Sequence, residues 1–164
     1  MQCYYQYDTI LGSITFVEEG GTLVAITTHD SCVGIEQETP LIQKAFLQLS
    51  EYFRGERRQF DLPLNPRGTV FQKQVWKALL EIPYGETRSY KQIAEAIGNP
   101  KAVRAVGMAN NRNPLLIVVP CHRVIGANGK LVGYGAGLDK KEFLLRLEKV
   151  SMSKYKLFLN SVSF

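Results

Sequence analysis

An apolar run that ends in a thiol restricts this chain more than any other feature. Residues 117–125 read Ile-Val-Val-Pro-Cys-His-Arg-Val-Ile, which places Cys121 between two β-branched stretches. A cysteine in that setting is expected to be buried, and a buried thiol is normally inert. Here a histidine and an arginine follow it directly, and such neighbours favour a thiolate over a thiol. The run is therefore either a core segment with an incidental cysteine or a buried nucleophile next to its base.

The composition is that of an ordinary globular chain. Of the 164 residues 45% are hydrophobic, a fraction typical of folded rather than disordered proteins. No apolar stretch approaches the roughly 20 residues that span a bilayer, and the first residues lack the basic and apolar regions of a signal peptide. Three cysteines favour a reducing compartment over a disulfide framework. We therefore expect a cytoplasmic protein with no membrane partner.

The charge is distributed unevenly along the chain. Residues 1–66 carry four basic and nine acidic side chains, a net charge of −5, whereas residues 67–150 carry fourteen and six, a net charge of +8. Residues 151–164 add two lysines. Such an asymmetry indicates that the second part faces a polyanion. A basic domain can also be merely soluble, so charge alone makes nucleic acid a favoured partner and no more.

The first part reads as strands followed by one helix. Three short segments rich in Tyr, Ile, Val and Thr are separated by glycine turns, as in an antiparallel meander. Thr39-Pro40 is typical of a helix start, and apolar residues then recur at helical spacing until Gly55. The three predicted strands are residues 2–7, 13–17 and 22–28.

The second part reads as mostly helical. Two prolines and a glycine in residues 60–69 indicate a linker. Two of the helices that follow are short and separated by Gly98-Asn99-Pro100, which is the pattern of a helix-turn-helix. The predicted helices are residues 69–80, 89–97, 101–110 and 138–149. For residues 151–164 the default expectation is a packed or frayed terminus.

These elements predict an α/β (α+β) protein. We expect a small N-terminal antiparallel β-sheet domain with a helix, including the linker, over residues 1–66. A mostly helical domain with a winged-helix-like helix-turn-helix is expected over residues 67–150, and a C-terminal extension over residues 151–164.

The surroundings of Cys121 resemble a known family. Asn113-Pro114 lies eight residues upstream, Tyr134 lies thirteen downstream within Gly-Tyr-Gly-Ala-Gly, and Glu148 lies twenty-seven downstream. This spacing resembles the O6-alkylguanine-DNA alkyltransferases, over at least residues 70–148. The resemblance implies direct-reversal repair, in which O6-alkylguanine, and also O4-alkylthymine, leaves the duplex and its alkyl group passes irreversibly to Cys121. It implies no cofactor and a single turnover.

The resemblance also assigns the catalytic roles. His122 would take the thiol proton, through a bridging water, and Glu148 would orient the imidazole, which is triad logic with one water inserted. Asn113 would align the helix-turn-helix with the active-site segment. From the residues alone, each has a plainer interpretation: Cys121 as a structural thiol, Glu148 as a surface carboxylate between Arg146 and Lys149, and Asn113 as part of an ordinary turn.

Further residues carry over to the DNA and the base. Tyr90 would help turn out the nucleotide and donate a proton toward the departing guanine, although periodicity alone permits a core aromatic. Arg104 would fill the gap that the extruded base leaves, although a solvated arginine is commoner. The remaining assignments are a slim helix that approaches the minor groove (Ala102, Ala105 and Gly107), positive charge on the DNA side (Arg112 and Arg123), and a base pocket (Val124, Tyr134, Gly135 and Ala136).

Other functions and sites stay open from the sequence. A non-catalytic lesion-binding protein would lack Cys121, an alkylation-sensing helix-turn-helix regulator usually needs a further domain, and nothing indicates the peptide cleft of a cysteine hydrolase. His29, Cys32 and Cys3 do not make a complete four-ligand zinc set, so no metal is expected. The expected partner is double-stranded DNA containing alkylated guanine, bound by a monomer.

Overall fold

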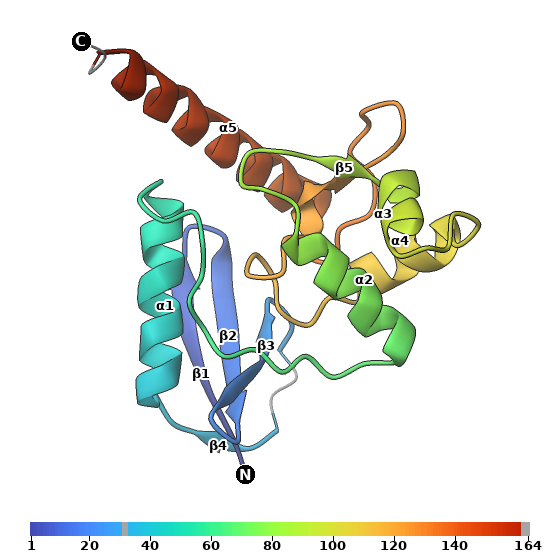
Figure 1. Cartoon of the computed structure of the whole chain (residues 1–164). Helices are drawn as coiled ribbons and strands as arrows, with labels where there is room; N and C mark the ends of the chain where they lie inside the picture. Colours follow the sequence, from blue (N-terminus) through green and yellow to red (C-terminus); the bar gives the residue numbers. More distant parts are fainter. Residues whose placement is uncertain (31–32, 162–164) are drawn as a thin grey trace.

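A computed structural model describes residues 1–30 and 33–161, with the side chains of residues 158, 159 and 161 left aside. It contains an N-terminal sheet covered by one helix, followed by a mostly helical part (Figure 1). The predicted fold class is confirmed. One cluster of buried side chains includes residues of both parts, from Ile14 in the sheet to Leu144 in the last helix.

The N-terminal sheet is a meander with one added strand. It is formed by β1 (Gln2–Thr9), β2 (Gly12–Glu19), β3 (Thr22–Thr27) and β4 (Ile35–Glu36), in the spatial order β3-β2-β1-β4. The first three strands pair antiparallel as predicted, but β4 pairs parallel with β1, so the sheet is not purely antiparallel. A two-residue strand has no periodicity of its own, which is why the sequence did not indicate it.

Helix α1 (Pro40–Phe53) packs on one face of this sheet (Figure 1). The Thr39 hydroxyl accepts a hydrogen bond from the Ile42 amide at 3.2 Å, and Pro40 occupies the first turn, where its missing N–H costs nothing. The buried stripe of the helix ends in Tyr52, which is fully buried. This helix therefore carries a phenol from the sheet domain toward the second part of the chain.

The second part consists of four helices around the cysteine segment. They are α2 (Val70–Leu80), α3 (Tyr90–Ala96), α4 (Val103–Asn111) and α5 (Leu138–Ser161). Cys121–Arg123 forms one 3-10 turn. The two-residue strand β6 (Val124–Ile125) follows it directly and pairs parallel with β5 (Arg88–Ser89). The sequence did not predict this short ladder, which joins the start of α3 to the residues just after the cysteine.

Caps and one indole bond set the positions of the helices near the site. Ser89 and Gln92 form a reciprocal capping box, which places Tyr90 at the first position of α3. Trp76 Nε1 on α2 donates to the Ala109 carbonyl on α4 at 2.8 Å. Trp76 is 2% exposed, as a core residue is expected to be, and its bond ties the second helix of the helix-turn-helix to α2.

Strand β3 joins the sheet directly to the segment before the cysteine. The Ile26 amide donates to the Pro114 carbonyl at 2.8 Å, and the Leu116 amide donates to the Ile26 carbonyl at 3.0 Å. These are strand-like bonds at the sheet edge. The edge of the N-terminal sheet thus supports the residues that lead to Cys121.

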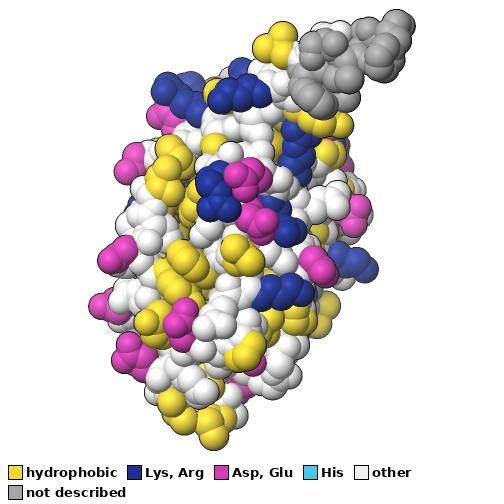
Figure 2. All heavy atoms as spheres, turned by 90° about the vertical axis from the view of Figure 1, so that its left-hand side faces the viewer, with side chains coloured by type: hydrophobic (Ala, Val, Ile, Leu, Met, Phe, Trp, Pro, Cys, Tyr) yellow, Lys and Arg dark blue, Asp and Glu magenta, His cyan; other side chains and the backbone are white. Residues whose placement is uncertain are grey.

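Helix α5 continues well beyond its predicted end. It runs to Ser161 rather than to about residue 149, and its last turns project away from the body (Figure 1). The face in Figure 2, on the side of α1, carries acidic and basic side chains interspersed with hydrophobic ones rather than one continuous basic patch. Among the residues that the structure describes, no helix is both long and apolar enough to cross a membrane.

Candidate active site

Two consecutive tight turns lead the backbone to the cysteine. The Val118 amide donates to the Leu116 carbonyl at 2.7 Å around Ile117, whose φ of 70° makes this the strained form of the γ-turn. The Cys121 amide donates to the Val119 carbonyl at 2.8 Å around Pro120. A β-branched residue with positive φ costs on the order of 1–3 kcal/mol. Surrounding bonds must therefore hold this segment in place.

Asn113 provides most of those bonds. Its Nδ2 donates to the carbonyls of Val119 at 2.7 Å and Leu115 at 3.2 Å, and its Oδ1 accepts from the Leu115 amide at 3.0 Å. The same Nδ2 lies 3.1 Å from Cys121 Sγ. One buried amide thus folds the strained loop around itself and places an N–H beside the sulfur. This geometry goes beyond the ordinary turn that Asn113-Pro114 could have been.

The thiol is almost completely enclosed. Cys121 is 2% exposed, and burial raises the pKa of the thiol to about 11, against the opposing effects of the Asn113 amide, the Lys141 ammonium and the Tyr134 hydroxyl. The resting group is therefore a thiol with three groups poised to stabilise a thiolate. A base has to take the proton before the sulfur can act as a nucleophile.

His122 and Glu148 form a buried hydrogen-bonded pair beside the cysteine. His122 Nε2 lies 2.5 Å from Glu148 Oε2, and both side chains are buried. Burial lowers the pKa of His122, although the Glu148 hydrogen bond opposes it. Burial would raise the pKa of Glu148, but the bonds and charges of His122 and Arg123 outweigh it and lower that pKa to about 2. A neutral imidazole thus donates from Nε2 to a carboxylate.

The other imidazole nitrogen of His122, Nδ1, is free to accept a proton. His122 Nδ1 is buried and has no hydrogen-bond partner among the described residues. With Nε2 donating to Glu148, Nδ1 carries the lone pair and is the basic nitrogen. The spacing of Glu148 along α5 thus brings about the pairing expected of it, and the surface interpretation of this carboxylate does not hold.

The structure corrects the place expected for Arg123. This side chain is 7% exposed and does not lie on a DNA-facing surface. Its Nε donates to Glu148 Oε1 at 2.8 Å and its Nη1 donates to the Ile82 carbonyl at 2.8 Å. The 3-10 turn at residues 121–123 directs the guanidinium inward, where a buried carboxylate binds it more strongly than solvent would. It neutralises Glu148 instead of attracting phosphate or the thiolate.

Lys141 lies beside the cysteine but was not among the residues that the sequence indicated. It is fully buried, and its Nζ donates to the carbonyls of Val124, Val132 at 2.9 Å and Gly133 at 3.3 Å. Burial lowers the pKa of Lys141 to about 8, and the Cys121 charge opposes this. Its position was detectable, because Lys141, Leu144 and Glu148 share one face of α5 at helical spacing.

Tyr90 and Lys141 hold the same segment of the predicted base pocket. The Tyr90 hydroxyl donates to the Val132 carbonyl at 2.7 Å, and the Lys141 ammonium lies 5.9 Å from the centre of the Tyr90 ring. Both side chains thereby hold the start of the segment that includes Tyr134, whose hydroxyl acts on the Cys121 sulfur. Of the four predicted pocket residues, Val124 is buried, Tyr134 and Ala136 are half-buried, and Gly135 is exposed.

Apart from Arg123, the predicted DNA-binding residues lie on α4 or at its two ends. Arg104, Ala105 and Arg112 are exposed, and Ala102 and Gly107 are half-buried. Gly107 faces Tyr90, because a Cβ built on it would lie 3.8 Å from the Tyr90 ring. The slim helix therefore exposes Arg104 to solvent and approaches the Tyr90 ring at Gly107, about one turn further along.

The residues considered for zinc are not gathered together where the structure describes them. Cys3 lies in β1, with its sulfur 3.7 Å from Gln37 Oε1, and Cys32 falls outside the described residues. Among the described residues, no group of three or more histidine, cysteine or acidic side chains could hold a metal ion.

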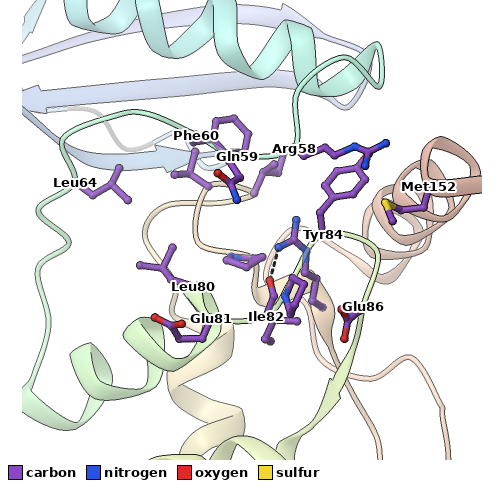
Figure 3. A pocket seen from close by; sticks show the side chains of 15 residues that line it. Arg58, Gln59, Phe60, Leu64, Leu80, Glu81, Ile82, Tyr84, Glu86 and Met152 are labelled. Carbon is purple, nitrogen blue, oxygen red and sulfur yellow. Dashed lines mark hydrogen bonds between the residues drawn. The ribbon is translucent and has the colours of Figure 1, made fainter. Parts of the chain in front are cut away.

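Two cavities flank the site without opening onto the sulfur. The larger, of about 670 Å³, is lined by Arg58, Tyr84 and Arg123, and Figure 3 shows Arg58 beside Tyr84 on its wall. The smaller, of about 300 Å³, is lined by Asn113 and Gly135. Cys121 does not line either of these two cavities. A nucleobase that reaches the Cys121 sulfur must therefore displace part of the protein that covers this side chain.

Comparisons with known proteins identify the family. Residues 3–66 match the family model described as 6-O-methylguanine DNA methyltransferase, ribonuclease-like domain, and residues 70–150 match the model described as its DNA binding domain. A methylated-DNA–protein-cysteine methyltransferase of Methanosarcina acetivorans is 63% identical over 123 residues, which are 75% of this chain and 77% of that protein. The protein of the same name in Mycobacterium tuberculosis is 50% identical over 151 residues, 89% of this chain and 92% of its own.

Solved structures agree with these matches. The crystal structure of Mycobacterium tuberculosis OGT in complex with DNA superposes with a TM-score of 0.86 at 49% identity, over 91% of this chain and 94% of that one. The crystal structure of the O6-methylguanine methyltransferase of the same organism gives a TM-score of 0.84 at 47% identity, over 92% and 94%. With its cysteine, base and carboxylate assembled in one buried site, the chain belongs to the O6-methylguanine-DNA methyltransferase family.

Proposed function

We propose that Cys121 of this methylated-DNA–protein-cysteine methyltransferase accepts the alkyl group of O6-alkylguanine from double-stranded DNA. Direct-reversal repair is the function of the family to which the chain belongs. The observation that carries the assignment of Cys121 is its position. Its sulfur receives the Asn113 amide at 3.1 Å, and the residue after it is the base held by Glu148.

The transfer is a direct displacement at the alkyl carbon. The Cys121 proton passes to His122 Nδ1, through a bridging water, and Glu148 offsets the resulting charge on the imidazole. The sulfur then forms its bond to the alkyl carbon while the bond from that carbon to guanine O6 breaks. The product thioether is stable, so each protein molecule acts once. No cofactor takes part in this scheme.

The guanine leaves as an anion unless a proton reaches it. Tyr90 can donate one toward a ring nitrogen as negative charge develops on the base. In the free protein its hydroxyl is bound to the Val132 carbonyl, so the base would replace that carbonyl as acceptor. Val124, Tyr134, Gly135 and Ala136 form the rest of the base pocket, and the methyl group of Ala136 limits the size of the alkyl group.

Entry of the base requires movement of the segment that covers the thiol. Cys121 is only 2% exposed, and the Tyr134 side chain forms a hydrogen bond with it. Residues 132–137 are held by side chains, Tyr90 and Lys141, rather than by a sheet or helix. Side-chain bonds can be exchanged without unfolding an element, so we propose that this segment opens when the base enters.

The helix-turn-helix supplies the DNA contact. Arg104 projects from α4, exposed, and would occupy the gap in the base stack, since extrusion costs a few kcal/mol that an inserted guanidinium partly recovers. Ala102, Ala105 and Gly107 keep the helix slim enough for the minor groove. Arg112 adds a phosphate contact. We propose a monomer that acts in the cytoplasm and also takes O4-alkylthymine.

The intact mass of the protein after incubation with methylated duplex tests this function. Transfer adds one methyl group per protein molecule, with no further gain on prolonged incubation or with excess DNA. A lesion-binding protein or an alkylation-sensing regulator without transfer activity would bind the same duplex at unchanged mass. That outcome would contradict the proposed function.

A further inference from the structure

Tyr52 reaches the catalytic carboxylate from the other half of the chain. It lies on α1 of the sheet domain, 96 residues before Glu148, and its hydroxyl donates to Glu148 Oε2 at 2.5 Å. The same oxygen receives His122 Nε2, also at 2.5 Å. Both bonds are completely buried. The sheet domain therefore supplies a hydrogen bond to the group that orients the base.

We infer that Tyr52 is a positioning residue of the alkyl transfer, whose hydroxyl fixes Glu148 Oε2 and limits the hold of that oxygen on the His122 proton. The inference rests on the proposed function, because it assigns a role within the relay that activates Cys121. In this proposal Tyr52 contacts neither the alkylated guanine nor the Cys121 sulfur. It acts only through the Glu148 carboxylate. It also gives the N-terminal domain a part in the chemistry.

The other donors to the carboxylate show why the Tyr52 bond matters. Oε1 receives the Gly85 amide at 3.0 Å and Arg123 Nε at 2.8 Å. Oε2 receives Arg123 Nη2 at the longer distance of 3.2 Å, beside the two bonds from Tyr52 and His122. Oε1 keeps its two donors without Tyr52. Loss of the Tyr52 hydroxyl would therefore concentrate negative charge on Oε2, the oxygen that faces His122.

Packing rather than the hydroxyl holds the Tyr52 ring. Its centre lies 5.7 Å from that of Phe60 and 6.0 Å from that of Tyr84, the latter edge to face. Removal of the oxygen alone should leave this aromatic cluster in place. Tyr52→Phe is accordingly a change in the carboxylate's hydrogen bonding with little change in shape.

Several charged or titratable groups surround the imidazole, from each element packed against it. Arg123 and Lys141 are the cations whose charges act against protonation of His122, while Glu148 favours it. The other titratable neighbours of the relay are Cys121, Tyr84, Tyr90 and Tyr134. All of these stay in place in Tyr52→Phe. A change in the titration of His122 can then be traced to the missing hydroxyl.

The direction of the change follows from charge. With one donor fewer, Glu148 Oε2 binds the Nε2 proton more tightly, so the imidazolium is stabilised and the pKa of His122 rises. Loss of one hydrogen bond to the charged carboxylate is expected to raise the pKa of His122 by about one unit. A protonated His122 cannot accept the thiol proton, so transfer slows most at low pH.

The test compares the pH profile of methyl transfer in wild type, Tyr52→Phe and Tyr84→Phe, all as full-length protein. Tyr84→Phe is the matched control, because it removes a hydroxyl from the same cluster that is not among the donors to Glu148 in the described residues. We expect the acid limb of the pH–rate profile to lie about one pH unit higher in Tyr52→Phe than in wild type. The rate should fall progressively as the pH drops below the pKa of His122, approaching tenfold where the imidazole is mostly protonated in both proteins, and return to within about twofold of wild type at pH 9.

A second readout does not depend on DNA. The 15N resonances of His122 should titrate with a higher midpoint in Tyr52→Phe and with an unchanged midpoint in Tyr84→Phe. An unshifted midpoint, or a loss of rate that is the same at every pH, would overturn the inference and leave Tyr52 as a packing residue. If wild type transfers no methyl group, the proposed function fails, while the His122 titration still decides whether Tyr52 tunes the base.

Discussion

Asn113 Nδ2 lies 3.1 Å from Cys121 Sγ and 2.7 Å from the Val119 carbonyl, so one amide both folds the loop before Cys121 and contacts its sulfur. The loop contains a positive φ at Ile117, which the chain would otherwise avoid. Reactivity and local strain are thus coupled through a single side chain.

The comparison of Asn113→Asp with Asn113→Ala should separate these two roles. The carboxylate keeps the size of the amide and can still accept from the Leu115 amide, but it donates no hydrogen bond and brings negative charge to the sulfur. We expect the alkyl-transfer rate to fall at least tenfold, since a loss of about 1.4 kcal/mol already gives that factor.

Asn113→Ala provides the comparison. It should unfold more easily by about 2–4 kcal/mol, because it leaves buried carbonyls unpaired, but it brings no charge to the thiol. Urea unfolding and single-turnover kinetics measure the two effects. Faster transfer in Asn113→Asp than in Asn113→Ala at equal folded fraction would contradict the electrostatic part of this account.

Arg104→Ala should impair repair in duplex DNA far more than reaction with the free modified base. The residue is proposed to serve extrusion, and a free base has no stack to leave. A decrease of tenfold or more is expected with duplex, and less than twofold with the free base. Rates on the two substrates, measured side by side, give the ratio.

Arg112→Ala is the matched control for that experiment. It removes an exposed arginine at the end of the same helix, and its expected effect is weaker, more uniform DNA binding. The slope of log affinity against log salt should decrease in magnitude by about 0.9, the contribution of one phosphate contact. Equal losses on duplex and free base in Arg104→Ala would place that residue in the chemical step or in the fold.

Acid should destabilise the protein through Glu148. Its pKa is lowered to about 2 in the folded state from an ordinary 4.5, so on acidification the unfolded chain takes up the proton first. The stability that the carboxylate provides is complete above about pH 4.5 and is lost as the pH falls toward 2, amounting to about 3 kcal/mol. Urea unfolding at a series of pH values measures it.

Glu148→Gln shows how much of the acid sensitivity belongs to this group. The variant is less stable at neutral pH, but its stability should fall less steeply than that of wild type between pH 4.5 and 2. Two parallel curves would mean that other carboxylates cause the acid effect, and that the ionised Glu148 contributes nothing to folding.

The sequence predicted the helices and strands and the residues around Cys121, but not that the Arg123 side chain points into the protein. Meander, helix-turn-helix and nucleophile segment were readable, because periodicity and turn residues are local signals. The direction of Arg123 was not, since a 3-10 turn places neighbouring side chains on faces that no periodic pattern specifies. Its adjacency to Cys121 therefore indicated the wrong partner.

The unpredicted members of the site come from distant segments. Tyr52 was readable as a core position of its helix, yet nothing local shows that it meets a carboxylate 96 residues away. Lys141 lay on the same face as Glu148, but lysines are rarely buried, and the sequence analysis assigned it no role. The contact of Tyr52 depends on the packing of the two halves of the chain, and that of Lys141 on the path of residues 124–133, which only the structure provides.

The position of the transferred methyl group tests the central claim most directly. Protein incubated with duplex carrying isotopically labelled O6-methylguanine is digested, and its peptides are mapped by mass spectrometry. The account predicts one labelled methyl group on Cys121 and none in Cys121→Ala, although that variant still binds the duplex. Labelled methyl on Cys3 or Cys32, or transfer by Cys121→Ala, would contradict it.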